Sequence, residues 1–430
     1  MAKKSEMKKK LRWVRLDNAA KIYPAALRRN WSNVYRQSVT LTEKVDVPTL
    51  QRALDVTVTR FPTIAARLRR GAFWYYLQQV PQAPRIREES SYPLTRMTRP
   101  EMRSSAFRVI AYEDRIAVEF FHSLTDGTGA QIFLKTLTAE YLEQKYGIRV
   151  PAQLGVLDRR EEPKEEELED SFPKYAGKVK ASRKDTNAWH MWGEEQPGGF
   201  LHQVCFQLPV EAVHSHARQH GVSITVFLGA VMMLALQNLQ REKEPPQRRK
   251  RIKLQIPVNL RRLFPSRTLR NFSMYTTPEL DPRLGDYSLD EICSIIQHKM
   301  GLEVTAKHMS AVIATNVADE RNMAVRLIPL PIKNLVMRAI YDAVGEKKSC
   351  LSMSNLGPVQ IPQVMKPYIR RFDLVLPIQA SAPYNCGVVS YEDTLYINFI
   401  RNIRQAELER HFHGVLRDLG IPVLVESNGN

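Results

Sequence analysis

Cysteine is scarce and scattered in this sequence, and this bounds the chemistry that the chain can carry. Its 430 residues include only Cys205, Cys293, Cys350 and Cys386. No two of them show the Cys-x-x-Cys spacing or any other metal-ligand spacing, and no disulfide framework is indicated. Such cysteine usage suits a reducing compartment. We therefore expect a cytoplasmic protein that holds no metal ion.

Long apolar runs are also missing. The longest extends from Val226 to Leu236, well short of the roughly 20 residues that span a bilayer, and it predicts a buried helix instead. Residues 1–10 form a lysine-rich tail with no apolar segment behind it, unlike a secretory signal. We expect no transmembrane segment, although the basic tail leaves peripheral contact with an anionic membrane open.

Acidic residues are outnumbered. The chain has 63 Lys and Arg against 45 Asp and Glu, a net charge of +18. This excess suits nucleic acid, an anionic membrane or a phosphorylated small molecule, or it serves solubility alone. No recognised nucleic-acid motif accompanies the charge, so we expect no nucleic-acid partner. The densest basic cluster is Arg248, Arg249, Lys250 and Arg251.

The order of predicted elements indicates a mixed α/β protein in two halves. Hydrophobic residues make up 43% of the chain, enough for more than one core. Residues 11–157 and 200–430 each mix strands with helices, and the glutamate-rich segment 158–199 reads as a charged surface linker. The main predicted strands are 34–41, 73–77, 107–112, 116–121, 200–208, 252–258, 350–357, 369–376, 387–391 and 394–400. The main predicted helices are 47–61, 131–146, 210–220, 226–240, 289–309, 328–340 and 405–419.

One stretch carries the clearest chemical signal. A predicted buried strand ends at Phe121, and His122 follows it directly. Asp126, Gly127 and Gly129 then form a tight turn before the next helix. An imidazole held at a strand end suits a general base, because its ordinary pKa lies near neutrality. Asp126 would orient the ring or lock the loop through an arginine. A histidine in this position is also often only structural, so the string alone leaves catalysis open.

Three motifs in order resemble one family. Residues 121–127 resemble the His-His-x-x-x-Asp-Gly signature of the two-domain coenzyme A-dependent acyltransferases, with Phe121 in place of the first histidine. Residues 257–262, followed by 269–272, resemble the Asn-x-Arg segment of that family and the turn after it. Residues 352–357 are similar to its Ser-Asn-x-Gly strand end. The family includes alcohol acetyltransferases, polyketide-associated acyltransferases and condensation domains. The bacterial alcohol-acetyltransferase-like branch is the most similar.

The resemblance implies two chloramphenicol-acetyltransferase-like domains with a tunnel between them. Acyl-CoA would be the co-substrate, with no cofactor bound, and the acceptor would be a small alcohol or amine. His122 would be the general base, Asp126 would pair with Arg261, and Gly127 would set the backbone geometry. Candidate donors to the oxyanion, or channel residues, are Ser352, Ser354 and Asn355. The cluster Arg248–Arg251 is the candidate site for the phosphates of CoA.

Two alternatives stay open at this point. A condensation-type enzyme would take its acyl group from an acidic carrier protein, which a basic surface also suits. A non-catalytic relative would keep the fold without the reaction, although the intact His122, Asp126 and Gly127 argue against it. We expect a monomer, because one chain can build the tunnel. The acceptor and the acyl chain length stay undetermined.

Overall fold

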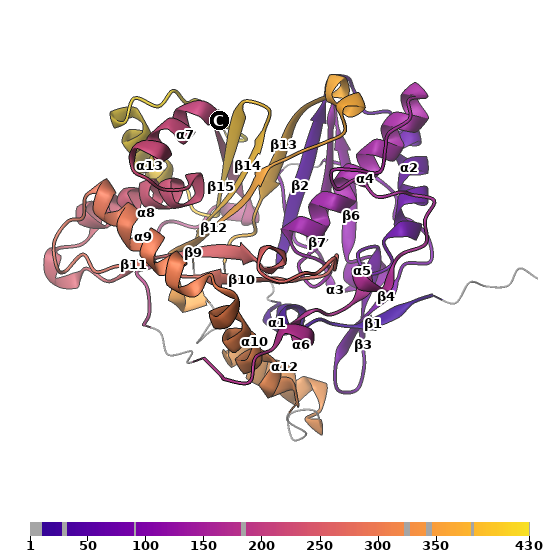
Figure 1. The fold of residues 1–430 in the computed structure, drawn as a ribbon, viewed down its shortest axis with the longest axis horizontal. Coiled ribbons are helices and arrows are strands. Elements are labelled where there is room, and N and C mark those ends of the chain that lie inside the picture. The colour runs from indigo at the N-terminus through magenta and orange to yellow at the C-terminus, as the bar shows by residue number, and fades with distance from the viewer. Residues whose placement is uncertain are drawn as a thin grey trace, which may run out of the picture.

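The structure is a computed structural model that describes residues 11–27, 32–89, 92–181, 186–321, 327–340, 346–379 and 382–429. The basic tail predicted for residues 1–10 lies outside the described residues. Two large sheets stand side by side, each with helices packed on it (Figure 1). The mixed α/β class predicted from the sequence is confirmed.

The first sheet gathers the strands that lead to the predicted site. Its order is β13 (Ile369–Val375), β2 (Val34–Leu41), β7 (Arg115–Phe121), β6 (Phe107–Tyr112) and β5 (Arg87–Glu88). Helices α2 (Val47–Arg60) and α4 (Gly127–Tyr146) pack against each other beside this sheet (Figure 1). Asp46 caps α2 by accepting from the Thr49 amide, and Pro62 follows soon after its end, as expected for a helix bounded by a cap and a proline.

The second sheet belongs to the other half of the molecule. Its order is β10 (Ser273–Thr276), β9 (Ile252–Asn259), β12 (Leu351–Pro358), β14 (Tyr384–Tyr391), β15 (Thr394–Arg401), β8 (His202–Pro209) and β16 (Leu424–Ser427), with β11 (Glu279–Leu280) paired to β9. Its helices are α7 (Val210–Gln219), α8 (Ile224–Lys243), α9 (Leu289–Glu303) and α13 (Glu407–Asp418).

Helix α8 is the core helix of this half. It packs against α7, α9, α13 and β9, and its apolar side chains point in most directions, as expected of a helix surrounded by protein. Among the described residues it alone is long and apolar enough to cross a membrane, yet most of its apolar stretch is buried by its neighbours.

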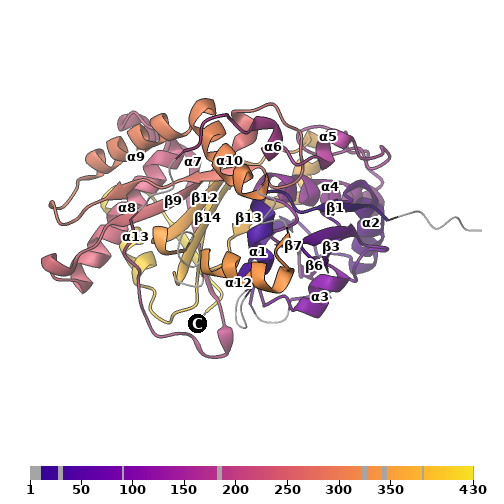
Figure 2. The same cartoon turned by 90° about the horizontal axis from the view of Figure 1, so that it is seen from below.

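Smaller elements complete the fold at one end. A third sheet has the order β1 (Trp13–Arg15), β4 (Tyr75–Gln79) and β3 (Ala66–Arg70). The remaining helices are α1 (Ile22–Ala26), α3 (Arg99–Ser104), α5 (Glu165–Leu168), α6 (Phe172–Tyr175), α10 (Ala306–Arg321) and α12 (Leu330–Ile340). Helix α1 packs against α12 at the lower side of the molecule (Figures 1 and 2).

The two halves are joined through a shared strand. Strand β13 comes from the second half of the chain but pairs with β2 of the first sheet, with Phe372 opposite Val39. It also crosses β14 of the second sheet at very short range. A Cβ atom added to Gly387 would lie 2.3 Å from the backbone oxygen of Leu374. Only glycine allows this approach, so the junction between the sheets requires a residue without a side chain at position 387.

Three sequence predictions need correction. Gly127 and Gly129, expected in a turn before a helix at 131–146, lie in the first turn of α4, because Asp126 caps the helix at that point. The single helix predicted for 289–309 is two helices, α9 and α10. The break occurs because Thr305 acts as a cap, its hydroxyl accepting from the His308 amide. The surface linker predicted for 158–199 is partly packed into the protein. Leu168 and Phe172 are buried, and the carboxylate of Glu167 makes a two-pronged ion pair with buried Arg60, with distances of 2.6 and 2.8 Å.

Replacing Gly387 by alanine tests the close junction of the sheets. We expect Gly387→Ala to lower the free energy of unfolding by about 2 kcal/mol or more, because backbone atoms must move to admit the methyl group. Gly301→Ala is the matched control. Gly301 lies within α9 with open space around it, so alanine there should be neutral or stabilising by up to about 1 kcal/mol. Urea unfolding curves of both variants measure the difference, and equal midpoints would contradict the account.

Candidate active site

The candidate base stands where the sequence places it. Strand β7 ends at Phe121, and the His122 amide donates to the Asn33 carbonyl at 2.9 Å. The chain turns at once, with the Leu124 amide donating to the Phe121 carbonyl. Helix α4 then begins, capped by Asp126, whose Oδ1 accepts from the Gly129 amide at 3.2 Å. The turn that carries His122 is therefore fixed at both of its ends.

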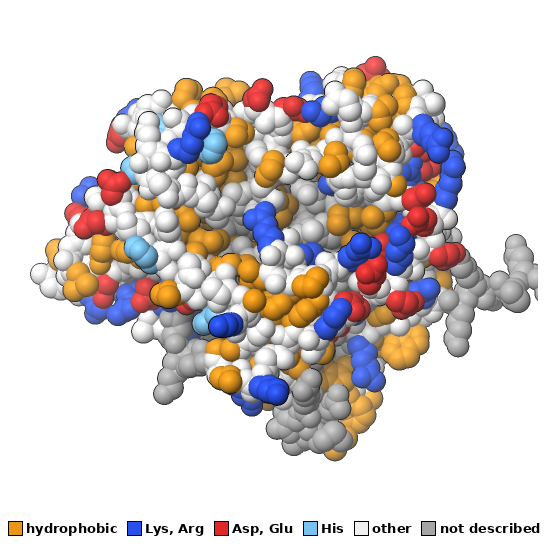
Figure 3. Space-filling model, in the orientation of Figure 1, with side chains coloured by type: hydrophobic (Ala, Val, Ile, Leu, Met, Phe, Trp, Pro, Cys, Tyr) orange, Lys and Arg blue, Asp and Glu red, His pale blue; other side chains and the backbone are white. Residues whose placement is uncertain are grey.

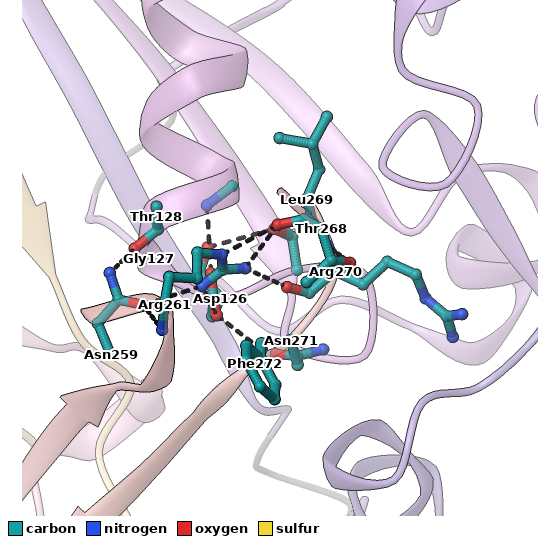
Figure 4. Close-up of polar contacts among 12 residues, drawn as sticks. Asp126, Gly127, Thr128, Asn259, Arg261, Thr268, Leu269, Arg270, Asn271 and Phe272 are labelled. Atoms are coloured by element: carbon teal, nitrogen blue, oxygen red, sulfur yellow. Dashed lines mark hydrogen bonds and ion pairs between the residues drawn. The ribbon is translucent and has the colours of Figure 1, made fainter. Parts of the chain in front are cut away.

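The other carboxylate oxygen of Asp126 binds the second half of the chain. Its Oδ2 accepts from Arg261 Nη1 and from the Phe272 amide, both at 2.8 Å (Figure 4). Both side chains are largely buried, which makes the ion pair costly to break on one side. Since both oxygens have partners, Asp126 is positioned to fix the turn rather than to transfer protons. Arg261 is the partner that the sequence predicts.

Arg261 also binds backbone carbonyls of the segment that follows β9. Its guanidinium donates to the carbonyl of Thr268 from Nε at 3.0 Å and to that of Arg270 from Nη2 at 2.7 Å. The amide of Asn259, at the end of β9, accepts from Arg261 and donates to Thr128 Oγ1 at 3.1 Å. The end of β9 thereby holds the first turn of α4 (Figure 4). A planar group with several donors suits this role, and lysine could not reproduce it.

The two glycines of the motif serve close contacts. Thr125 Oγ1 donates to the Leu269 carbonyl at 2.6 Å, and a Cβ on Gly129 would lie 2.2 Å from that same oxygen. A Cβ on Gly127 would lie 2.7 Å from a methyl carbon of Leu356, at the end of β12. The glycines therefore let both segments of the second half reach the start of α4.

The His122 ring lies between aromatic rings and is bonded through one nitrogen. Tyr23 stacks on it at a centroid distance of 4.7 Å, and Tyr35 lies at 4.9 Å. His122 Nδ1 is 3.2 Å from Asn271 Oδ1, and Asn271 Nδ2 donates to buried Asp17 Oδ2 at 3.2 Å.

These contacts assign the tautomer of His122. Burial raises the pKa of Asp17, but its Oδ1 accepts from the Ala20 amide and its Oδ2 faces the Arg270 guanidinium at 3.7 Å, and both contacts favour the carboxylate. A carboxylate only accepts hydrogen bonds, so the NH₂ group of Asn271 faces Asp17 and its carbonyl oxygen faces the histidine. Nδ1 therefore carries the proton and donates to Asn271. The other ring nitrogen, Nε2, keeps its lone pair in the neutral ring, which is what a general base requires.

Burial also keeps the ring neutral. Removal from water lowers the pKa of His122 below its ordinary value of 6.5, despite a hydrogen bond to its own backbone, the charge of Asp126 and the bond to Asn271, all of which raise it. Burial therefore favours the neutral imidazole at neutral pH.

Asn271, Tyr23 and Asp17 are functional candidates that sequence reasoning missed. The segment 269–272 belongs to a recognised motif, but the sequence gives no sign that Asn271 contacts a histidine 149 residues earlier. Asp17 and Tyr23 lie near the N-terminus, and only the folded chain brings them beside this site.

The predicted donors on β12 lie in or beside the core of the second half. The Ser352 amide donates to Asn385 Oδ1 at 2.7 Å. The Asn355 side chain has partners at both of its polar atoms, since Nδ2 donates to Thr225 Oγ1 and Oδ1 accepts from the Gly357 amide. Asn355 therefore shapes the strand end. A bond from Ser352 or Ser354 to an oxyanion stays a prediction.

The basic cluster Arg248–Arg251 lies away from this turn. It precedes β9, whereas Asn259 at the other end of that strand contacts the site. Eight residues of strand separate the two ends by about 23 Å. Arg249 pairs with Asp286 at 3.4 Å, and Arg251 pairs with Glu279. CoA binding at this cluster stays a prediction. Within the described ranges, no group of three or more His, Cys, Asp or Glu residues could hold a metal ion.

The Arg261 contacts predict a specific stability pattern. We expect Arg261→Met to lower the free energy of unfolding by about 3–5 kcal/mol, because it leaves a buried carboxylate without its cation. Arg261→Lys should cost about 1–3 kcal/mol, since the charge stays while the bonds to two carbonyls are lost. Chemical denaturation measures both.

The neighbouring Arg262 is exposed and provides the control. Arg262→Met should change the unfolding free energy by no more than about 0.5 kcal/mol. A loss at Arg261 no larger than that at Arg262 would show that the ion pair does not hold the turn.

Solved structures of other proteins share the fold of this chain. No protein-family model and no curated protein sequence matches the chain. The chain is similar to TRI101 from F. graminearum, solved with coenzyme A and deoxynivalenol, at a TM-score of 0.64 and 10% identity over 97% of this chain and 100% of that one. It is also similar to the trichothecene 15-O-acetyltransferase TRI3 from Fusarium sporotrichioides, at a TM-score of 0.61 and 13% identity over 95% and 94% of the two chains.

The first condensation domain of the CDA synthetase has the same architecture, at a TM-score of 0.56 and 14% identity over 96% of this chain and 99% of that one. At such identities the likeness concerns the fold. The chain therefore has the two-domain fold of the CoA-dependent acyltransferases and condensation domains that its sequence motifs predict.

Proposed function

We propose that this protein is an acyltransferase that moves an acyl group from acyl-CoA to a hydroxyl or amine acceptor, with His122 as general base. The observation that carries the proposal is the set of contacts around the ring. Nδ1 is held by Asn271, which leaves the Nε2 lone pair available at a strand end. The fold supports acyl transfer, since solved proteins of this architecture include an O-acetyltransferase and a protein bound to coenzyme A.

The proposed reaction follows from this geometry. Nε2 removes the proton of the acceptor hydroxyl as its oxygen attacks the thioester carbonyl, which gives a tetrahedral oxyanion and an imidazolium. The C–S bond then breaks, and the imidazolium returns its proton to the CoA thiolate. The Nδ1–H bond to Asn271 holds the ring in place throughout. Positioned bases of this kind contribute about 10²–10⁴-fold to rate.

Other parts of the site belong to the same proposal. Ser352 and Ser354 are the proposed oxyanion donors, and Asn355 supports the strand end that carries them. The proposed tunnel runs between the two halves, where the space-filling view shows the surface hollowed (Figure 3). Arg248–Arg251 is the proposed contact for CoA phosphates. We propose a cytoplasmic monomer.

A specific observation also favours an acidic carrier protein as the source of the acyl group. The net charge of +18 suits an acidic carrier protein as well as CoA, and a condensation domain has the same fold. The acyl group would then arrive on the carrier, with the same role for His122. Turnover of free acyl-CoA distinguishes this donor from the first.

Removing the base tests the chemistry. In His122→Ala we expect acceptor-dependent thiol release from acyl-CoA to fall by about 10²-fold or more, because the proposed proton acceptor is removed. Purified wild type and variant are compared on a panel of alcohols and amines. His298→Ala is the control, since this histidine is exposed on α9 and should leave the rate unchanged. A His122 variant as active as wild type would refute the proposed base.

The pH dependence tests the state of the ring. Protonated His122 has no lone pair, so kcat/KM should fall as pH drops through the pKa of the ring, and burial places that pKa below 6.5. We expect a constant rate above neutrality. Asn271→Asp places a carboxylate against the ring and should move the acidic limb to higher pH. Rate profiles of both proteins measure this, and a wild-type limb above pH 6.5 would contradict a desolvated imidazole.

A further inference from the structure

Helix α12 directs polar side chains toward the protein and apolar side chains outward, the reverse of the usual arrangement for a surface helix. Its inward face carries Leu330, Lys333 and Asn334, spaced three and four residues apart. Lys333 is buried, lies over the Trp74 ring at 3.4 Å and donates to the Phe73 carbonyl, and Asn334 donates to the Tyr75 hydroxyl. Polar side chains thus attach this helix to the protein.

Its outward face is apolar. Ile332, Leu335 and Val336 share one side of the helix and are 56%, 71% and 47% exposed. Phe73, 44% exposed at the tip of the β3–β4 hairpin, adjoins the helix through its carbonyl, which accepts from Lys333, and Leu327, 64% exposed, lies three residues before the helix. Hydrophobic side chains are visible at the lower edge of the molecule, where α12 lies (Figures 1 and 3). Apolar side chains gathered in this way on a surface usually mark a binding face.

The two segments that form this face carry charge of one sign. The segments 66–75 and 327–340 contain five basic residues and no Asp or Glu. Arg70 and Arg338 are exposed, one at the hairpin and the other in the last turn of α12. An apolar face bordered by arginines complements a surface with an apolar interior and anionic groups at its boundary.

The face is connected to the candidate site. Helix α12 packs on α1, and Tyr23 of α1 stacks on the His122 ring. Figure 2 shows α12 and α1 side by side at the lower side of the molecule. One short helix therefore separates the apolar face from the proposed base.

We propose that the α12 face, defined as Phe73, Leu327, Ile332, Leu335 and Val336 with Arg70 and Arg338, docks on an anionic lipid bilayer. Apolar side chains enter the boundary of the acyl chains while the arginines contact lipid phosphates. Resting on the proposed function, the docking also implies a substrate class. An acceptor or acyl chain dissolved in the bilayer would enter beside α1, close to His122.

Vesicle flotation tests the docking with the full chain. We expect binding to vesicles of phosphatidylcholine mixed with phosphatidylglycerol, and much weaker binding to phosphatidylcholine alone or at high salt. The double variant Leu335→Ser with Val336→Ser should lower the partition coefficient about tenfold or more, because two apolar anchors are lost. Arg338→Glu should lower it as well, through charge alone.

Leu284→Ser is the matched control. Leu284 is 81% exposed and lies on the loop between β11 and α9, whereas α12 lies at the lower edge of the molecule (Figure 1), so its loss should leave vesicle binding unchanged. The basic tail is present in every variant and cannot produce a difference between them. Absence of binding to anionic vesicles, or equal binding by the double variant and the control, would overturn the proposal. A wild-type dimer that the double variant dissociates would assign the face to a second copy of the chain instead.

The same variants separate this inference from the proposed chemistry. With a water-soluble acceptor and a short acyl-CoA, the double variant should keep the wild-type rate, since α12 is not part of the reacting groups. Vesicle binding without any acyl transfer would refute the proposed function and leave the docking intact. Acyl transfer without vesicle binding would refute the docking alone.

Discussion

The Asp126 carboxylate joins three segments that lie far apart in the sequence. It caps α4 through the Gly129 amide, and it binds Arg261 and the Phe272 amide from the second half of the chain. A carboxylate buried without such partners would be strongly destabilising. The first turn of α4 and the segment 268–272 are therefore held together by the same group, and the position of each depends on the other.

The position of His122 follows from this connection. Asn271 reaches the imidazole because Arg261 and Asp126 fix the residues on either side of it, and Asp17 then sets the orientation of its amide. The tautomer of the proposed base is thus decided by residues from both halves of the molecule. The shared strand β13 and the close crossing at Gly387 keep those halves in a fixed relation.

Local patterns in the sequence predicted much of this arrangement. Strand β2 has the bounds expected from its β-branched run, and α2, α7 and α13 agree with prediction to within a few residues. The pairing of Asp126 with Arg261 was predicted through a family motif. The break between α9 and α10 was missed because apolar spacing continues through the cap at Thr305.

What the sequence could not show depends on contacts between distant segments. Nothing local marks β13 as a strand of the other sheet, or Asn271 as the partner of His122. Residues 158–170 were expected to be exposed because they are acidic, but Glu167 is neutralised by Arg60, whose position is known only after folding. The inverted face of α12 was also hidden, because its pattern alone would place the apolar side inward.

The tautomer of His122 is the most direct test of the account. Nitrogen NMR of protein labelled at histidine distinguishes a protonated Nδ1 from a protonated Nε2, and comparison with a His122→Gln sample assigns the signals. We predict a neutral ring at pH 7 with the proton on Nδ1 and a bare Nε2. A proton on Nε2, or an imidazolium at that pH, would contradict it, because neither state leaves Nε2 able to accept the acceptor's proton.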